Sequence, residues 1–240
     1  MPDTESQTGR ITPAMEDYLK AIYTLQQQES TVTTSLLGEQ RGFKPGSVSA
    51  MLKKLAEQNL VVHTPYQGVQ LTDTGEKIAL EVIRHHRLLE LYLVEALGYS
   101  WDEVHEEAER LEHHISEKLE ARIAAHLGHP TFDPHGDPIP TPDGTLPHRD
   151  NLRLADLPVG TTARICRVQD QHAERLRYLA GLGLVPGATL CIVASAPFDG
   201  PISVQINNTI QALDRRFART IMVDRPVEST ATATPTSADN

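Results

Sequence analysis

The sequence predicts a mainly α-helical chain with a small all-β domain at its C-terminal end. Apolar residues recur at helical spacing in three stretches, residues 13–28, 45–58 and 77–127. Past residue 150 the pattern changes to short runs of strand-forming residues between glycine and proline turns. At 240 residues, with 39% hydrophobic and 22% charged residues, the chain is long enough for two or three small globular domains.

The N-terminal segment has the element order of a DNA-binding domain. Thr12 and Pro13 open the first helix as N-cap and first helical residue, and Pro45 opens the third. The expected helices and strands cover residues 13–28, 34–40, 45–58, 60–63 and 68–71, with turns at 41–44 and 64–67. Helix, helix, turn, helix and hairpin is the order of a winged helix-turn-helix, which predicts such a domain over residues 12–75.

The third helix is the expected recognition helix, because its first residues meet base edges in the major groove. Its small side chains permit a close approach, and its lysines can neutralise phosphates. The residues expected to contact DNA are Lys44, Pro45, Ser47, Ser49, Ala50, Lys53 and Lys54. No Arg, Asn or Gln lies in the first turn, so specificity is expected to depend on DNA shape and thymine methyl groups. The alternative is that Ser47 only caps the helix and the lysines form an ordinary solvated face.

The net charge of −10 argues against a nucleic-acid partner at first sight. Residues 33–70, however, hold four Lys and Arg residues against two Glu residues, a local balance of +2. A weakly basic face on an acidic body is compatible with a regulator of transcription.

Residues 76–129 form the second predicted domain, with helices over 77–97 and 101–119 and Ser100 as the N-cap of the second helix. His105, Glu109, Glu112 and His113 lie at offsets 0, +4, +7 and +8, along one stripe of that second helix. His86 and Glu90, at i and i+4, share one face of the helix before it. Clustered carboxylates repel one another, and a divalent cation relieves that repulsion. The alternative is an acidic, solvated helical face with scattered histidines.

Further residues bear on the function. Glu16 and Asp17 could add a carboxylate from the first helix, whereas His85, His114 and His126 are interpreted as surface or core histidines.

The sequence lacks the motifs of two classes of metalloenzyme. His105-Glu106-Glu107-Ala108-Glu109 lacks the second histidine of the zinc-protease motif H-E-x-x-H. Arg110 stands where the Glu-x-x-His motif of di-iron proteins would need a glutamate three residues before His113. We therefore expect no enzyme.

The composition also bears on location. The chain has only two cysteines, Cys166 and Cys191, which fits a reducing cytoplasm. We expect no membrane association, because no apolar run has membrane-spanning length and the first residues lack the apolar core of a signal peptide.

The last third begins with a Pro-, Gly- and Asp-rich linker at residues 130–150, where a regular helix or central strand is excluded. A small β-barrel is then predicted at 151–225. Its expected strands are 161–168, 189–194, 202–206 and 220–223, interrupted by a helix at 171–180. Residues 1–11 and 226–240 are expected to be disordered tails.

The chain resembles the diphtheria toxin repressor family of iron- and manganese-dependent regulators, from about Thr12 to about Val223. The resemblance rests on the segments MEDYLKAIY (15–23), KPGSVSAMLKKL (44–55), HHRLLELYL (85–93), VHEEAERLEHHIS (104–116) and FDPHGDPIP (132–140). It implies a winged helix-turn-helix, a helical dimerisation domain and an SH3-like barrel. It also implies a homodimer that binds a palindromic operator on double-stranded DNA and represses metal-uptake genes when metal is plentiful, with no small-molecule substrate.

The resemblance also implies two metal sites per subunit. The primary site would be formed by Asp17, Glu109, Glu112 and His113, and the ancillary site by His86, Glu90 and His105. In longer members the C-terminal domain donates two more ligands, for which His172 and Glu174 are the candidates here.

The identity of the donors bears on the choice of metal. Iron-responsive members have Met and Cys where this chain has Asp17 and Glu109, so Mn(II) is favoured over Fe(II). Lys20 replaces a glutamate ligand of some small manganese regulators, which argues against a closely paired two-metal centre. The remaining alternative is a winged-helix regulator that senses a small molecule.

Overall fold

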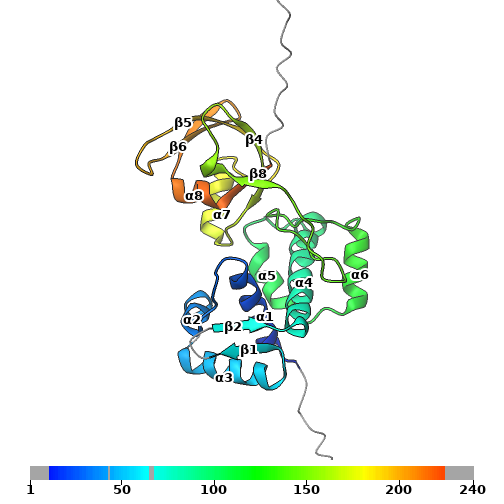
Figure 1. Ribbon diagram of the computed structural model, residues 1–240. Helices are drawn as coiled ribbons and strands as arrows, with labels where there is room; N and C mark the ends of the chain where they lie inside the picture. Colours follow the sequence, from blue (N-terminus) through cyan, green and yellow to red (C-terminus); the bar gives the residue numbers. More distant parts are fainter. Residues whose placement is uncertain (1–10, 43, 65–67, 225–240) are drawn as a thin grey trace, which may run out of the picture. The chain divides into compact units, whose positions relative to one another are not determined.

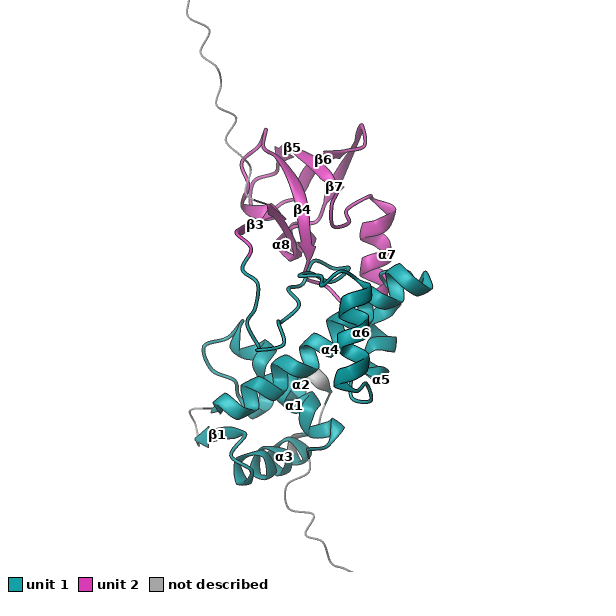
Figure 2. Ribbon diagram, turned by 90° about the vertical axis from the view of Figure 1, so that its right-hand side faces the viewer, with its two compact units in different colours: residues 1–148 teal, residues 149–240 magenta. Residues whose placement is uncertain are grey.

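The computed structural model describes residues 11–42, 44–64 and 68–224, except for the side chains of Gln40, Arg41 and Pro45. The chain divides into two compact units, Met1–His148 and Arg149–Asn240 (Figure 2). The described residues leave out Phe43 in the expected turn and residues 65–67 at the tip of the expected hairpin. They also leave out the expected tails, apart from Ile11.

The first unit begins with three helices and a hairpin, which confirms the predicted order (Figure 1). Their bounds are α1 Pro13–Gln26, α2 Thr34–Arg41, α3 Pro45–Glu57, β1 Val61–Thr64 and β2 Gly68–Leu71. Thr33 caps α2 by accepting a hydrogen bond from the Leu36 amide, and Gly42 ends it with a φ of 65°. The strands pair antiparallel from Val61↔Leu71 to Thr64↔Gly68.

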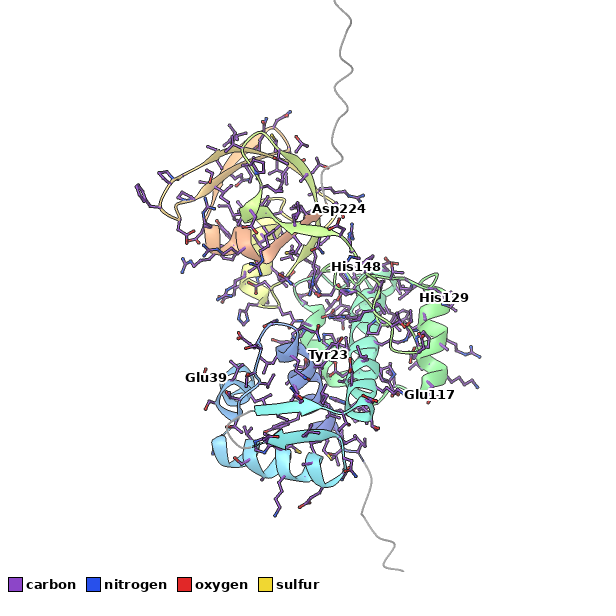
Figure 3. The ribbon with its side chains drawn as sticks, in the orientation of Figure 1. Tyr23, Glu39, Glu117, His129, His148 and Asp224 are labelled. Carbon is purple, nitrogen blue, oxygen red and sulfur yellow. The ribbon has the colours of Figure 1, made fainter. Side chains whose placement is uncertain are left out.

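The core of this bundle is aliphatic and is built from the predicted helical stripes. Its fully buried large side chains include Met15, Leu19, Ile22, Leu37, Leu52 and Leu55. Tyr23 on α1 is also buried, whereas Glu39 on α2 lies at the surface (Figure 3). The core fixes α3 so that its polar face stays in solvent.

A long helix, α4 Asp73–Leu97, follows the hairpin. Thr72 caps it by accepting from the Gly75 amide, and Gly98 ends it in the left-handed region with a φ of 74°. Gly75 is required for packing, because a Cβ atom there would lie 2.0 Å from the Leu60 carbonyl oxygen. The helix is therefore anchored to the turn that precedes β1.

The prediction of a single helix over 101–119 is wrong, because the helix ends at Leu111 and a new one begins at Glu117. The structure has α5 Val104–Leu111 and α6 Glu117–His126. Ser116 is extended, and its hydroxyl accepts from the Leu119 amide, so it begins a new helix. Ser100 is not an N-cap, since its carbonyl instead accepts from the Glu103 amide in a turn that precedes α5.

The proline-rich segment after α6 is irregular, and part of it is buried against α4. His135 is 1% exposed and Ile139 is 2% exposed. Arg84 on α4 donates to the Pro140 carbonyl at 2.6 Å, and Arg87 donates to the carbonyl of Pro138. This segment therefore packs against the helical domain, whereas its composition had predicted a linker.

The second unit is a six-stranded antiparallel sheet in the order β3-β8-β4-β5-β6-β7. The strands are β3 Asn151–Arg153, β4 Thr162–Val168, β5 Thr189–Ser195, β6 Ile202–Ile206, β7 Thr209–Leu213 and β8 Ile221–Asp224. The helices are the 3-10 turn η1 Leu154–Asp156, α7 Ala173–Gly181 and α8 Arg215–Thr220. The all-β class is confirmed, while β3, β7 and α8 were not predicted. Among the described residues, no helix has the length and apolar content needed to cross a membrane.

Candidate metal centre

Three helices of the first unit and the proline-rich segment after α6 bring the candidate ligands together. Glu16, Asp17 and Lys20 come from α1, His86 and Glu90 from α4, and His105, Glu109, Glu112 and His113 from α5 and the turn after it. In each of three groups, one possible ligand atom per residue lies within 4.8 Å of the others. The groups are Asp17, Glu112 and His113, then His86, His105 and Glu109, then Glu90, Asp133 and His135.

The first group joins α1 to the turn after α5. Asp17 Oδ1 lies 3.1 Å from His113 Nε2, and Glu112 Oε1 lies 3.5 Å from the same nitrogen. Glu112 is past the end of α5, but it keeps helical dihedral angles, with φ −56° and ψ −30°. The predicted stripe therefore continues through Glu112 although the regular helix ends at Leu111.

Glu16 fixes the orientation of the His113 ring. Its Oε2 lies 2.5 Å from His113 Nδ1, so Nε2 is the nitrogen that faces Asp17 and Glu112. A carboxylate on the far nitrogen is the usual support of a metal-binding histidine. The hydrogen bond that His113 donates to Asp17, together with the one to Glu16 and against the effect of burial, raises the pKa of His113 to about 9.

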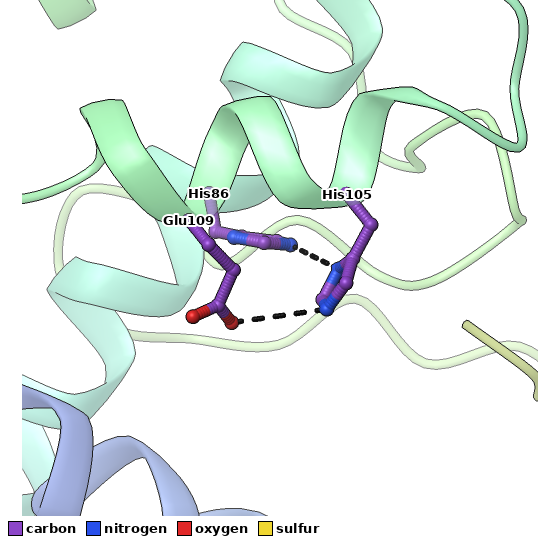
Figure 4. A group of neighbouring side chains, drawn as sticks. All are labelled: His86, His105 and Glu109. Carbon is purple, nitrogen blue, oxygen red and sulfur yellow. Dashed lines mark hydrogen bonds and ion pairs between the residues drawn. The ribbon is translucent and has the colours of Figure 1, made fainter. Parts of the chain in front are cut away.

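The second group lies between α4 and α5. Figure 4 shows His105 facing both His86 and Glu109. Its Nδ1 lies 3.1 Å from His86 Nε2, and its Nε2 lies 3.8 Å from Glu109 Oε1. Glu90 adds a carboxylate, because its Oε1 lies 2.9 Å from His86 Nε2 and 3.3 Å from His105 Nδ1. The structure thus brings the predicted ancillary residues together and places Glu109 beside them.

The ammonium group of Lys20 lies at the boundary between the first two groups. It donates to Glu109 Oε1 at 2.9 Å and to Glu112 Oε1 and Oε2 at 2.9 and 2.8 Å, and it lies 3.2 Å from His86 Nδ1. Lys20 is 7% exposed. A buried charge needs such partners, since burial alone would cost several kcal/mol.

In the third group, His135 and Asp133 lie beside the buried carboxylate of Glu90. His135 Nε2 lies 2.7 Å from the Trp101 carbonyl, and its Nδ1 lies 3.6 Å from Glu90 Oε2. Asp133 Oδ1 is occupied by the backbone amides of His135 and Asp137, as in an Asx turn. Asp133 therefore shapes the proline-rich segment.

Burial would raise the pKa of Glu90, but the adjoining histidines hold it well below its ordinary value. For His135 the effect of burial is opposed chiefly by Glu90, which raises the pKa of His135 to about 9. His135 was missed in the sequence, where FDPHGDPIP is dominated by its prolines.

Of the histidines interpreted as surface or core residues, His85 is in the core. Its Nδ1 lies 3.1 Å from the Glu112 carbonyl, and its Nε2 lies 3.1 Å from Glu120 Oε2 on α6. Arg84 pairs with the other oxygen of Glu120 at 2.5 Å. This network holds the backbone of Glu112 in place, while His114 and His126 are exposed.

The chain matches three family models over most of its length. They are the N-terminal DNA-binding domain of iron-dependent repressors at residues 10–69, the metal-binding and dimerisation domain of the same repressors at 72–141, and the FeoA domain at 152–225. The iron-dependent repressor IdeR of Mycobacterium tuberculosis (strain ATCC 25618 / H37Rv) is 30% identical over 229 residues, which cover 90% of this chain and 99% of that protein. The chain belongs to the diphtheria toxin repressor family.

Solved structures of the family give the same fold. A manganese-dependent transcriptional repressor in complex with manganese is 43% identical, with a TM-score of 0.81 over 88% of this chain and 99% of that one. The manganese regulator SloR is 30% identical, with a TM-score of 0.73 over 90% of this chain and 100% of that one. Both iron- and manganese-dependent repressors are therefore relatives of this chain.

The recognition helix expected for a member of this family is α3. Val48, Leu52 and Leu55 are fully buried, so they fix the helix to the core. The opposite face is exposed and carries Lys44, Ser47, Ser49, Ala50, Lys53 and Lys54. The side chain of Pro45 lies outside the described part, and its backbone begins the helix.

The two C-terminal candidates lie in the second unit of this family member. His172 is at the N-cap position of α7 and Glu174 is in its first turn, and both are exposed. Asp170 Oδ1 accepts from the His172 amide at 3.0 Å. The assignment of His172 and Glu174 as ligands stays a prediction.

Proposed function

We propose that this chain is a Mn(II)-responsive, DNA-binding repressor that acts as a cytoplasmic homodimer on a palindromic operator and carries no catalytic activity. The observation that supports this proposal most strongly is the group formed by Asp17, Glu112 and His113. One member lies on a helix of the DNA-binding domain, and the other two lie beyond α5 in the dimerisation domain. A ligand held by all three would link the two domains.

The donor atoms fit a divalent metal ion. Asp17, Glu112 and His113 would hold one ion. Glu109 is retained as the further carboxylate of this primary site, although the structure places it in the group of His86 and His105. His86, Glu90 and His105 would hold a second ion. Both sets consist of carboxylate oxygens and imidazole nitrogens, and such donors without sulfur suit manganese better than softer ligands do. An ion at the primary site would supply positive charge that offsets these carboxylates.

DNA binding would depend on how firmly α1 is held to the turn after α5. With Asp17 fixed to Glu112 and His113, the DNA-binding domain has a restricted set of orientations. In a two-fold dimer the two α3 helices must reach major grooves about 34 Å apart on one face of DNA. Fixing the domains therefore favours the orientations that reach both half-sites, which is a population shift. Couplings of this kind are typically about 1–3 kcal/mol.

The test is an anaerobic DNA-binding titration on the organism's own metal-transporter promoter, with chelator, Mn(II) or Fe(II) added in turn. We expect binding that requires metal and saturates at a lower free concentration of Mn(II) than of Fe(II). An equal or better response to Fe(II) would replace manganese by iron as the signal. Binding in chelator alone would favour a winged-helix regulator of another small molecule.

Two variants test the assignment of ligands and of metal preference. Glu109→Ala should abolish metal-dependent DNA binding but leave the dimer intact, and metal-dependent binding by this variant would contradict the assignment. The double variant Asp17→Met, Glu109→Cys introduces sulfur donors and should broaden the response toward iron. An unchanged preference would show that selectivity arises elsewhere.

A further inference from the structure

Two consecutive histidines of α4 hold Glu112 at two different points. His86 Nδ1 lies 2.5 Å from the side-chain oxygen Oε2 of Glu112, and His85 Nδ1 lies 3.1 Å from its main-chain carbonyl oxygen. Glu112 is 1% exposed and His85 is 7% exposed, so both contacts lie in the interior of the helical domain. One residue of the proposed primary site is therefore tied to α4 through its backbone as well as through its carboxylate.

The carbonyl of Glu112 needs a donor because α5 ends there. The last carbonyl groups of a helix have no amide one turn further along the chain. The Leu111 carbonyl accepts from the His114 amide at 2.9 Å, whereas the Glu112 carbonyl faces the ring of His85. A carbonyl oxygen only accepts, so Nδ1 of His85 carries the hydrogen and donates. A buried carbonyl without a donor is costly, and the bond therefore favours one position of the turn.

The ring of His85 is itself held by α6. Its Nε2 lies 3.1 Å from Glu120 Oε2, and Arg84 donates to the other oxygen of Glu120 at 2.5 Å. Arg84 also donates to the Pro140 carbonyl at 2.6 Å. The side chains of Arg84 and Glu120 are only 10% and 13% exposed, so this ion pair is largely shielded from water. Both nitrogens of the His85 ring thus face fixed oxygens of the protein.

We propose, on the basis of the proposed metal-dependent function, that His85 is a positioning residue for the primary metal site. Both of its nitrogens are engaged by protein oxygens, so it acts through the Glu112 carbonyl and not as a ligand. Fixing this carbonyl fixes the start of the turn that presents Glu112 Oε1 and His113 Nε2 at 3.5 Å from each other. Ligands that are ordered in advance bind more tightly, so the anchor raises the affinity of the site for Mn(II).

Two variants separate the roles of the two ring nitrogens. The side-chain amide nitrogen of Asn takes about the place of Nδ1, and that of Gln takes about the place of Nε2; both are donors. His85→Asn therefore keeps a donor for the Glu112 carbonyl and loses the contact with Glu120. His85→Gln keeps the contact with Glu120 and loses the donor to Glu112. Both variants remove the ring, so they share the loss of packing.

The first measurement is a calorimetric titration of the chelator-treated protein with Mn(II), in which the primary site is the one that Asp17→Ala removes. Loss of a group that orients a ligand typically weakens metal binding about 10- to 100-fold, and we expect this for His85→Gln but no more than about threefold for His85→Asn. His114→Gln is the control, because His114 is exposed in the same turn, and should match wild type. Equal affinities of the two His85 variants, or weaker binding by His85→Asn, would overturn the proposal.

The second measurement is hydrogen exchange of the turn in chelator. The amides of Glu112 and His114 donate to the carbonyls of Ala108 and Leu111, each at 2.9 Å, so a well-held turn protects them. We expect exchange of these amides to be about tenfold faster in His85→Gln and close to wild type in His85→Asn. Unchanged exchange in both variants would overturn the anchor. Equal acceleration along all of α4 and α5 would also overturn it, because His85 would then stabilise the whole fold and not the turn.

The exchange measurement needs no metal, so it separates this inference from the function on which it rests. If wild type binds no Mn(II), the proposed function fails and the metal-site role of His85 fails with it. If wild type binds Mn(II) and gains DNA affinity, but His85→Gln and His85→Asn do not differ in affinity or exchange, only the role of His85 is refuted.

Discussion

Removal of the Glu112 carboxylate should destabilise the helical unit even in chelator. Glu112 is fully buried; both of its oxygens accept from Lys20, and Oε2 lies 2.5 Å from His86 Nδ1. In Glu112→Ala the buried ammonium keeps only its contacts with Glu109 and His86. Loss of one partner of a buried ion pair typically costs about 3–5 kcal/mol, and we expect a loss of this size.

The assay is urea unfolding with chelator throughout, followed by far-UV circular dichroism. Helices α1 to α6 all lie in the first unit, so the helical signal reports mainly on that unit. Glu106→Ala is the matched control, because the Glu106 side chain is 82% exposed. Its effect on the free energy of unfolding should stay within about 0.5 kcal/mol.

A double-mutant cycle with Lys20→Met separates lost charge pairing from lost packing. If the unpaired ammonium causes the damage, Glu112→Ala, Lys20→Met should lose at least about 1 kcal/mol less than the sum of its single variants. Strict additivity, or a loss below about 1 kcal/mol for Glu112→Ala alone, would refute the reasoning about this buried pair.

Two further predictions concern the DNA face and pH. Lys54→Ala should weaken binding to all DNA sequences and reduce the salt slope by about 1, measured by titration over salt concentration, whereas exposed Lys118→Ala should not. His135 has its pKa raised to about 9 from an ordinary 6.5, so its stabilising contribution is complete below pH 6.5 and is lost as pH rises to about 9. In chelator, the part of the fall in unfolding free energy that is due to His135 should be up to about 3 kcal/mol over this window, and His135→Gln should lack it. His113, whose pKa is also raised to about 9, adds a fall that His135→Gln leaves in place. A slope unchanged by His135→Gln would contradict this account.

Much of the architecture was predictable because local patterns determine it. The apolar stripes of α1 and α3 and the prolines that open them place these two helices within about two residues, whereas α4 begins four residues before its predicted start at residue 77. The spacing of His105, Glu109, Glu112 and His113 also predicted that these side chains face one region. Helical geometry alone was enough there, because Glu112 retains helical dihedral angles.

The remaining features depend on tertiary contacts that the pattern does not encode. The end of α5 depends on Ser116, whose hydroxyl caps the next helix where the pattern suggested continuation. His135 reaches Glu90 only because the proline-rich segment packs back onto α4. Likewise, Lys20 reaches Glu109 and Glu112 only because α1 packs against α4, whereas in the sequence it was only a lysine where some relatives have a glutamate.

The most direct test of the central claim is the gain in DNA affinity that metal confers on wild type and on Asp17→Ala. Asp17 is 34% exposed, so its removal should leave the fold and the DNA binding measured in chelator unchanged. At saturating Mn(II) we expect wild type to gain about 5- to 150-fold in affinity and Asp17→Ala to gain less than about twofold. A full gain in Asp17→Ala would show that metal controls DNA binding without joining α1 to Glu112 and His113, and would contradict the account.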